Sequence, residues 1–302
     1  MNWSLFFGEL VSGLTLGSIY ALIALGYTMV YGILKLLNFA HGDVYMVGAF
    51  VGFFVLQWLG GALSPAVTGW LVVAIMFVVG MLACGLLGVG IERFAYRPLR
   101  NAPRIAPLIS ALGVSIFLQN SALLLWGPQF RSYDTFDLVG VKSYHIGNNF
   151  FISNLQILTI AVSIGLTIVL ALVVSRTRTG KAMRATSFDR DAAEMMGISI
   201  DRVISFTFFL GSALAAAGGI MFGLVFGQIF SLMGFTAAVV GGIGSIPGAV
   251  LGGFLIGLTE AFATGYLPGG SVYANLYVFA LLIGMFLIRP SGLLGSPVIQ
   301  KV

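Results

Sequence analysis

The chain has 302 residues, of which 59% are hydrophobic and only 8% are charged. Soluble domains carry about 25% charged residues, so this composition excludes a chain built mainly of soluble domains and indicates that lipid is its main solvent. The net charge of +5 comes mostly from two short segments, which is typical of a membrane protein and argues against nucleic acid as a partner.

Apolar runs long enough to cross a bilayer recur along the chain. A membrane helix needs about 20 mostly apolar residues. The predicted spans cover residues 10–34, two spans within 44–91, and then 105–126, 155–175, 203–226, 235–265 and 272–288. We therefore expect an all-α polytopic helix bundle of about 8 transmembrane helices, forming a single domain over residues 1–302. No Lys or Arg precedes Lys35, so the first run is expected to be a retained helix and not a signal peptide.

The first interruption of the apolar pattern lies between the first two runs. It carries Asn38, His41, Gly42 and Asp43. An ionised group at the bilayer centre costs roughly 2.5–3.5 kcal/mol, so such groups face the bundle interior, pair, or lie at an interface. Two interpretations stay open: a plain cytoplasmic turn, or a helix break that faces a transport path.

Glycines and a proline interrupt the seventh run. Gly241, Gly242, Gly244 and Pro247 do not easily continue a helix. Broken helices at membrane depth occur only inside protein or along a cavity, where the N-termini of half-helices can face a carboxylate. One break in each half of the chain hints at an internal repeat, and both breaks are candidates for Gly-rich re-entrant segments.

The distribution of charge predicts which loops share a side of the membrane. Ten of the fifteen cations lie in residues 92–104 and 176–202, whereas the two cations of residues 127–154 are balanced by two acids. Cytoplasmic loops carry the excess of Lys and Arg, so 92–104 and 176–202 are expected to be cytoplasmic and 127–154 periplasmic. The side of the C-terminus stays open, because eight full crossings and the terminal cations give opposite answers.

The second basic loop contains the signals of a short helix. Asp189 is a predicted N-cap, and Gly197 is predicted to end a helix over residues 190–196 in the left-handed conformation. Its apolar residues are Ala192, Ala193, Met195 and Met196. They either pack on the protein's own helix ends or the membrane surface, or they form a docking helix for a cytoplasmic partner.

Other residue patterns limit the chemistry. Gly13-x3-Gly17, Gly48-x3-Gly52 and Gly248-x3-Gly252 predict close helix crossings, and Cys84 is interpreted as a small buried hydrophobe. The sequence has no Cys/His cluster for a metal, no nucleophile–base pair and no GxxxxGK[ST] phosphate loop. We therefore expect no cofactor and no enzymatic activity in this chain. The broken helices alone also allow a stand-alone secondary carrier of small amphipathic solutes, and a non-transporting membrane assembly protein is a third possibility.

Several motifs together resemble one known family. Asp191-Ala192-Ala193-x3-Gly197 resembles the EAA-type coupling motif of ABC importer permeases, with Asp in place of the usual Glu. The flanking GKAMRAT (180–186) and MGIS (196–199), with NFAHGDVYMVGAF (38–50), ERFAYRPLRNAPR (92–104), FTAAVVGGIGSIPGAVLGG (235–253) and RPSGLLG (289–295), resemble branched-chain amino acid permeases, most closely their LivH-type subunit. These segments span nearly the whole chain. The chain departs from the family between Gly227 and Phe235, where it is shorter than usual.

The resemblance implies a non-catalytic permease subunit of an ATP-driven importer in the bacterial inner membrane. Its substrate would be leucine, isoleucine, valine or a closely related amino acid, although related permeases serve urea or short amides. The implied partners are a second permease subunit, two cytoplasmic ATPase subunits and a periplasmic substrate-binding protein, in contact with membrane lipid. The implied ATPase-coupling residues, in loop 176–202, are Gly180, Arg184, Asp191, Ala192, Ala193 and Gly197. The implied translocation path is lined by Asn38, His41, Gly42, Asp43, Gly241, Gly242, Gly244 and Pro247.

Overall fold

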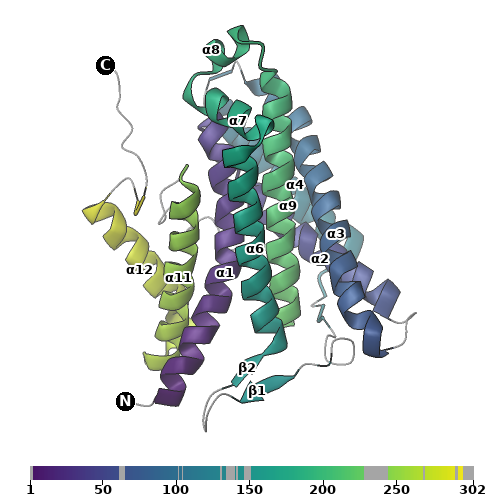
Figure 1. Ribbon diagram of the computed structural model, residues 1–302, viewed down its shortest axis with the longest axis vertical. Coiled ribbons are helices and arrows are strands. Elements are labelled where there is room, and N and C mark those ends of the chain that lie inside the picture. The colour runs from purple at the N-terminus through teal and green to yellow at the C-terminus, as the bar shows by residue number, and fades with distance from the viewer. Residues whose placement is uncertain are drawn as a thin grey trace.

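A computed structural model describes most of the chain as a bundle of long helices (Figure 1). The described residues are 3–60, 65–100, 102, 103, 105–129, 131–133, 140, 142–145, 151–227, 244–267, 269–289 and 292–294.

Within these residues, seven helices are long and apolar enough to cross a membrane. They are α1 (Trp3–Leu34), α2 (His41–Gly60), α3 (Pro65–Ile91), α4 (Ile105–Trp126), α6 (Asn154–Arg176), α9 (Ile200–Phe226) and α11 (Ile246–Tyr266). A further helix, α12 (Gly270–Ile288), contains a shorter apolar stretch. The prediction of an all-α polytopic bundle is confirmed, and the chain is a multi-pass membrane protein.

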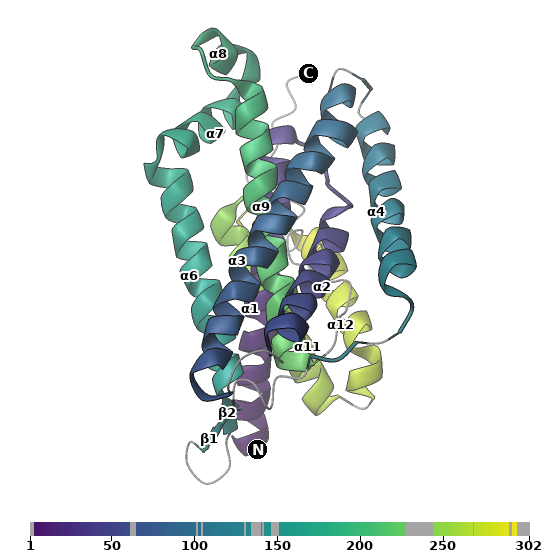
Figure 2. The same cartoon turned by 90° about the vertical axis from the view of Figure 1, so that its right-hand side faces the viewer.

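Shorter elements lie at the two ends of the bundle. The π-helix η1 (Glu92–Tyr96) and the 3-10 helix η2 (Arg97–Leu99) follow α3, and α7 (Arg178–Phe188) and α8 (Arg190–Met195) follow α6. Strands β1 (Ser143–His145) and β2 (Phe151–Ser153) form an antiparallel hairpin that the sequence did not predict. Figure 2 shows α7, α8 and the α3–α4 junction at one end, and the hairpin with the start of α1 at the other. This arrangement agrees with the expectation that the two basic loops share a side.

The centre of the bundle is formed by α1 and α9. In the most apolar stretches of these helices, 72% and 78% of the residues are buried, compared with 17% in α4 and α6. Small residues allow the central helices to cross closely, as predicted. A β-carbon on Gly17 would lie 2.7 Å from the Cα atom of Phe254 in α11, and a β-carbon on Gly48 in α2 would overlap the backbone of Ala216 in α9. Cys84 is fully buried, as expected.

Candidate functional site

The chain between α1 and α2 turns back into the bundle before α2 begins. The break covers residues 35–40. The sequence analysis placed His41, Gly42 and Asp43 in the break as well, and this is wrong, because they form the first turn of α2. Asn38, His41 and Asp43 are all buried, with at most 2% of each residue exposed. A plain surface turn would leave these polar groups in water. Their burial agrees with the interpretation of a helix break that faces the bundle interior.

Each of the buried polar residues has a definite neighbour. Asn38 Oδ1 accepts hydrogen bonds from its own turn, at the Ala40 backbone N–H (3.1 Å), and from the Tyr96 hydroxyl of η1 (3.0 Å). The Asp43 carboxyl accepts from Gln119 Nε2 of α4 (2.9 Å). The His41 ring lies edge-on to Tyr27 of α1, with 4.5 Å between the ring centroids. Asn38 therefore fastens the break to η1, and His41 and Asp43 fasten the first turn of α2 to α1 and α4.

Two of the residues that interrupt the seventh apolar run, Gly244 and Pro247, lie at the start of α11. Gly244 has a left-handed backbone with φ +98°, which favours glycine. The Ser245 side chain then accepts from the Gly248 N–H (3.2 Å), and Pro247 occupies the first turn, where its missing N–H costs nothing. Gly244 and Pro247 are exposed or partly exposed. Gly241 and Gly242 lie outside the described residues.

Helices α2 and α11 begin at a similar depth, but on opposite sides of α1. Helix α11 runs antiparallel to α1, with Gly253 against Ala21 and Gly257 against Gly17. Continuing this register places Ile246 level with Thr28, next to Tyr27, which the His41 ring contacts. This level is about two helical turns before the end of α1.

The two helix starts nevertheless lie on opposite faces of α1. Gly17 faces α11, whereas a β-carbon on Gly26 would meet His41 of α2. Residues nine apart on an α-helix, such as Gly17 and Gly26, point in opposite directions. The described residues of the two predicted path segments therefore do not form one cluster.

The second basic loop forms the predicted helix with the predicted caps. Asp189 accepts from the Ala192 N–H (3.0 Å) at the N-terminus of α8. Gly197 has φ +81°. Its N–H donates to Glu194 O (2.9 Å), and the Ile198 N–H donates to Ala193 O (3.1 Å). This double closure is a Schellman motif, so the predicted helix stop is confirmed.

The apolar residues of α8 divide between two directions. Ala193 is buried, whereas Met195 and Met196 are 82% and 83% exposed. Asp191 and Ala192 are also exposed. The prediction of one apolar side is therefore wrong for this helix: Ala193 packs inward, and the two methionines are exposed. Helix α8 itself lies at the tip of the bundle (Figure 1).

Gly180 and Arg184 hold α7 against the end of α6. A β-carbon on Gly180 would overlap the backbone of Val173 and Val174. The Arg184 guanidinium donates to the Val174 carbonyl, which is a free acceptor in the last turn of α6. These two predicted coupling residues therefore hold α7 in place, and Asp191, Ala192, Met195 and Met196 are exposed residues of the following helix.

The sequence did not predict how α8 is attached to the transmembrane core. Arg190 Nη2 donates to Ile33 O at the end of α1 (2.7 Å), directly before the break. Burial is the main cause that lowers the pKa of Arg190 from its usual value, with a further lowering by the nearby Arg100, whereas Asp191 raises it. Arginine keeps its proton under such shifts, so the contact is charge-assisted.

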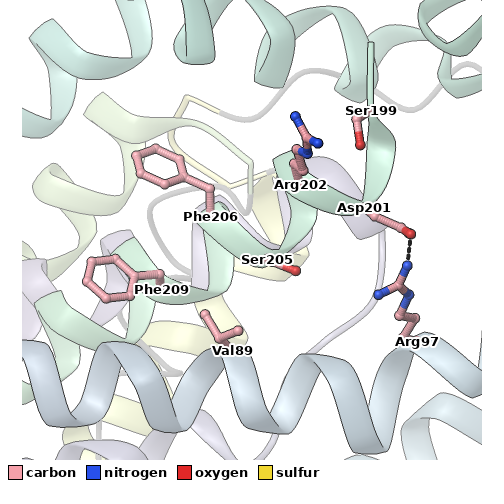
Figure 3. Close-up of a pocket in the computed structure, with 8 residues that line it drawn as sticks. All are labelled: Val89, Arg97, Ser199, Asp201, Arg202, Ser205, Phe206 and Phe209. Atoms are coloured by element: carbon pink, nitrogen blue, oxygen red, sulfur yellow. Dashed lines mark hydrogen bonds and ion pairs between the residues drawn. The ribbon is translucent and has the colours of Figure 1, made fainter. Parts of the chain in front are cut away.

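An ionic network joins the start of α9 to η1 and η2. Asp201 pairs with Arg97 and Arg100, and Arg100 also pairs with Glu92, which is fully buried. Figure 3 shows the Arg97–Asp201 pair. Ser205 of α9 donates to Glu92 Oε2 (2.7 Å). From the sequence alone these arginines were interpreted only as cations of the cytoplasmic loops, and their pairing with Glu92 and Asp201 was not predicted.

Comparisons with known proteins indicate a permease of branched-chain amino acid transport. Residues 9–288 match the family described as the permease component of the branched-chain amino acid transport system. The high-affinity branched-chain amino acid transport system permease protein LivH of Escherichia coli K12 is 42% identical over 305 residues, which is 98% of each chain. The corresponding BraD protein of Pseudomonas aeruginosa is 43% identical over 97% of each chain. A probable LivH protein of Methanocaldococcus jannaschii is 28% identical over 92% of this chain and 89% of its own length.

Proposed function

Because this chain belongs to the family of branched-chain amino acid transport permeases, we propose that it is the membrane-spanning subunit of an ATP-driven importer of leucine, isoleucine or valine. The observation that carries this proposal is family membership over nearly the full length, combined with an exposed helix at one end of the bundle. We assign that end to the cytoplasm, because it carries both basic loops. The membrane is then the bacterial inner membrane.

We assign α8 to the contact with a cytoplasmic ATPase subunit. The exposed Met195 and Met196 offer an apolar surface at a helix tip that lies beyond the membrane spans. Methionine surfaces adapt to the groove that receives them, and a short helix laid into a groove is a common way for proteins to dock. The exposed carboxylate of Asp191 and the turn at Gly197 complete this surface. The remaining partners are a second permease subunit, a second ATPase subunit and a periplasmic binding protein.

The contacts of α8 suggest how ATPase movement reaches the membrane core. Arg190 joins α8 to the end of α1. Asp201, which follows α8, pairs with Arg97 of η2 and with Arg100 directly after η2. Tyr96 of the neighbouring η1 then holds Asn38 in the break. A displacement of α8 is thus passed to the 35–40 break by two routes. In this proposal Asn38, His41 and Asp43 respond to the ATPase and do not touch the substrate, since they are buried.

The second break is the better candidate for a substrate-facing segment. Gly244 and Pro247 are exposed at the start of α11, about two helical turns below the level at which α1 ends. The N-terminus of a helix carries a partial positive charge and free N–H groups, which suit the carboxylate of an amino acid. We propose that this helix start faces the translocation path at the junction with the second permease subunit.

Co-purification tests the docking surface. The double variant Met195→Ser, Met196→Ser should leave the fold intact, because both side chains are exposed, and should greatly reduce recovery of the ATPase subunits in mild detergent. Phe94→Ser is the matched control, because Phe94 is 81% exposed but lies on η1. If the double variant recovered ATPase as well as the unchanged protein and Phe94→Ser did not, α8 would not be the docking helix.

A further inference from the structure

A groove between α3, η2 and α9 opens at the end of the bundle that we assign to the cytoplasm (Figure 3). Its volume is about 560 Å³. It is lined by Val89, Arg97, Ser199, Asp201, Arg202, Ser205, Phe206 and Phe209. None of the roles assigned above to this chain uses this space, although Asp201 and Arg97 of the ionic network form part of its rim.

The lining changes from cationic to apolar along one face of α9. Arg202, Phe206 and Phe209 are spaced four and three residues apart, so they follow one stripe of the helix. Arg202 lies in the first turn of α9, and Phe209 lies about 10 Å further along the axis, at 1.5 Å per residue. The Phe209 ring rests where Gly85 of α3 leaves room for it. The groove therefore has a charged rim at the membrane boundary and an apolar floor within the bilayer.

The charged residues at the rim of the groove differ in their partners among the described residues. Arg97 and Arg100 both pair with Asp201, and Arg100 also pairs with Glu92. Arg202 has no hydrogen-bond or ion-pair partner among the residues that the structure describes. The Ser199 hydroxyl is a further polar group of the lining, whereas the Ser205 hydroxyl already donates to Glu92 Oε2. An arginine guanidinium suits a phosphate group, with which it forms charge-assisted hydrogen bonds.

We infer that this groove binds one anionic phospholipid, with its phosphate at Arg202 and one acyl chain along Phe206, Phe209 and Val89. The two ends of the groove match the two ends of such a lipid. A soluble ATPase reaches only the rim, because the apolar floor lies at membrane depth. A helix with its side chains is about 10–12 Å wide, whereas a volume of about 560 Å³ falls within the range of small-ligand sites. Basic pockets between membrane helices on the cytoplasmic side are known to favour anionic headgroups.

Native mass spectrometry of the full chain in mild detergent tests this inference. The chain is titrated with phosphatidylglycerol and, separately, with phosphatidylcholine of identical acyl chains. The binding free energy that one cation near a lipid headgroup contributes corresponds to about a fivefold change in affinity. We expect Arg202→Gln to weaken phosphatidylglycerol binding about fivefold and to leave phosphatidylcholine binding unchanged. Arg202→Lys, which keeps the charge, should lie close to the unchanged protein.

Control variants distinguish a lipid site in the groove from a general effect of charge on lipid binding. Arg178→Gln removes an exposed cation from α7, outside the groove, and should change neither affinity. Phe206→Ala should weaken both lipids equally, because it shortens the apolar floor. Glycerol 3-phosphate should compete only weakly with phosphatidylglycerol, because it lacks the acyl chain.

Equal affinities for both lipids in the unchanged protein, or an equal loss of phosphatidylglycerol binding in Arg202→Gln and Arg178→Gln, would overturn the inference. Loss of ATPase recovery with unchanged lipid binding in Arg202→Gln would also overturn it and would assign the rim to a protein contact.

Discussion

Gly197 shows how one residue can set the end of a functional helix. Its φ of +81° is costly for any residue with a β-carbon, yet a β-carbon there would meet no other atom within 4 Å. Any effect of a substitution therefore comes from backbone strain and not from a clash. This separation makes the residue a clean probe of α8.

We predict that Gly197→Ala weakens ATPase binding by straining the turn after α8 by about 1 kcal/mol. Gly197→Asn is the matched control, because asparagine tolerates the left-handed conformation better than alanine. ATPase affinity, measured on the detergent-purified chain, should fall in the order Gly, Asn, Ala. Equal affinities for all three would show that the turn does not shape the docking surface.

Arg190 gives a second prediction at the scale of one residue. Arg190→Gln removes a charge-assisted hydrogen bond to Ile33 O, a class of contact that contributes about 1.5–3 kcal/mol. We expect ATP hydrolysis by the assembled complex to persist while amino-acid uptake falls, since α8 would still dock but would no longer move α1. Arg178→Gln should keep the normal ratio of uptake to hydrolysis. Normal coupling in Arg190→Gln would remove this tether from the mechanism.

Individual elements were predicted from the sequence with uneven success, for physical reasons. Caps are local signals, so Asp189 and Gly197 marked the ends of α8 well. The start of α2 was placed too late, because His41, Gly42 and Asp43 are polar and glycine-rich and resemble a loop. Only the packing against Tyr27 and Gln119, residues distant in sequence, shows that these groups are buried in a helix.

The contact between α2 and α4 can be tested at the level of the element. Gln119→Leu removes the donor to Asp43 and leaves a buried acceptor with one hydrogen bond fewer, which should lower the free energy of unfolding by about 1–3 kcal/mol. Asn120→Leu is the matched control, since Asn120 donates to Ile116 O of its own helix and is exposed. Thermal melting in detergent should show a clear decrease for Gln119→Leu only. Equal melting temperatures in both variants would contradict the role of this contact.

At the scale of the whole molecule, the sequence predicted the helix bundle and the grouping of the basic loops, but not the links between distant segments. Composition and run length indicate which helices enter the membrane, because lipid requires each span to be apolar. The pairing of Asp201 with Arg97 and Arg100 joins residues about a hundred positions apart, which no local pattern encodes. The same holds for the starts of α2 and α11, which lie on opposite sides of α1.

The ionic network that joins the two halves of the chain gives a further prediction. Glu92→Gln disrupts a buried pair with Arg100, and the loss of one partner in such a pair costs about 3–5 kcal/mol. Asp201→Asn disrupts pairs in which the Asp201 side chain is 41% exposed. It should therefore lower the free energy of unfolding by no more than about 1 kcal/mol. Melting temperatures of the two purified variants should differ accordingly. A larger decrease in melting temperature for Asp201→Asn than for Glu92→Gln would contradict this prediction. The exposed pairs of Asp201 would then contribute more to stability than the buried pair of Glu92.

The most direct test of the account is amino-acid uptake by proteoliposomes that contain the assembled complex and its binding protein. We predict that leucine enters only when ATP is present on the side of α8, and that an ion gradient without ATP drives none. Leucine uptake by this chain alone, driven by a gradient in the absence of ATP and ATPase subunits, would contradict the account and would identify a stand-alone carrier.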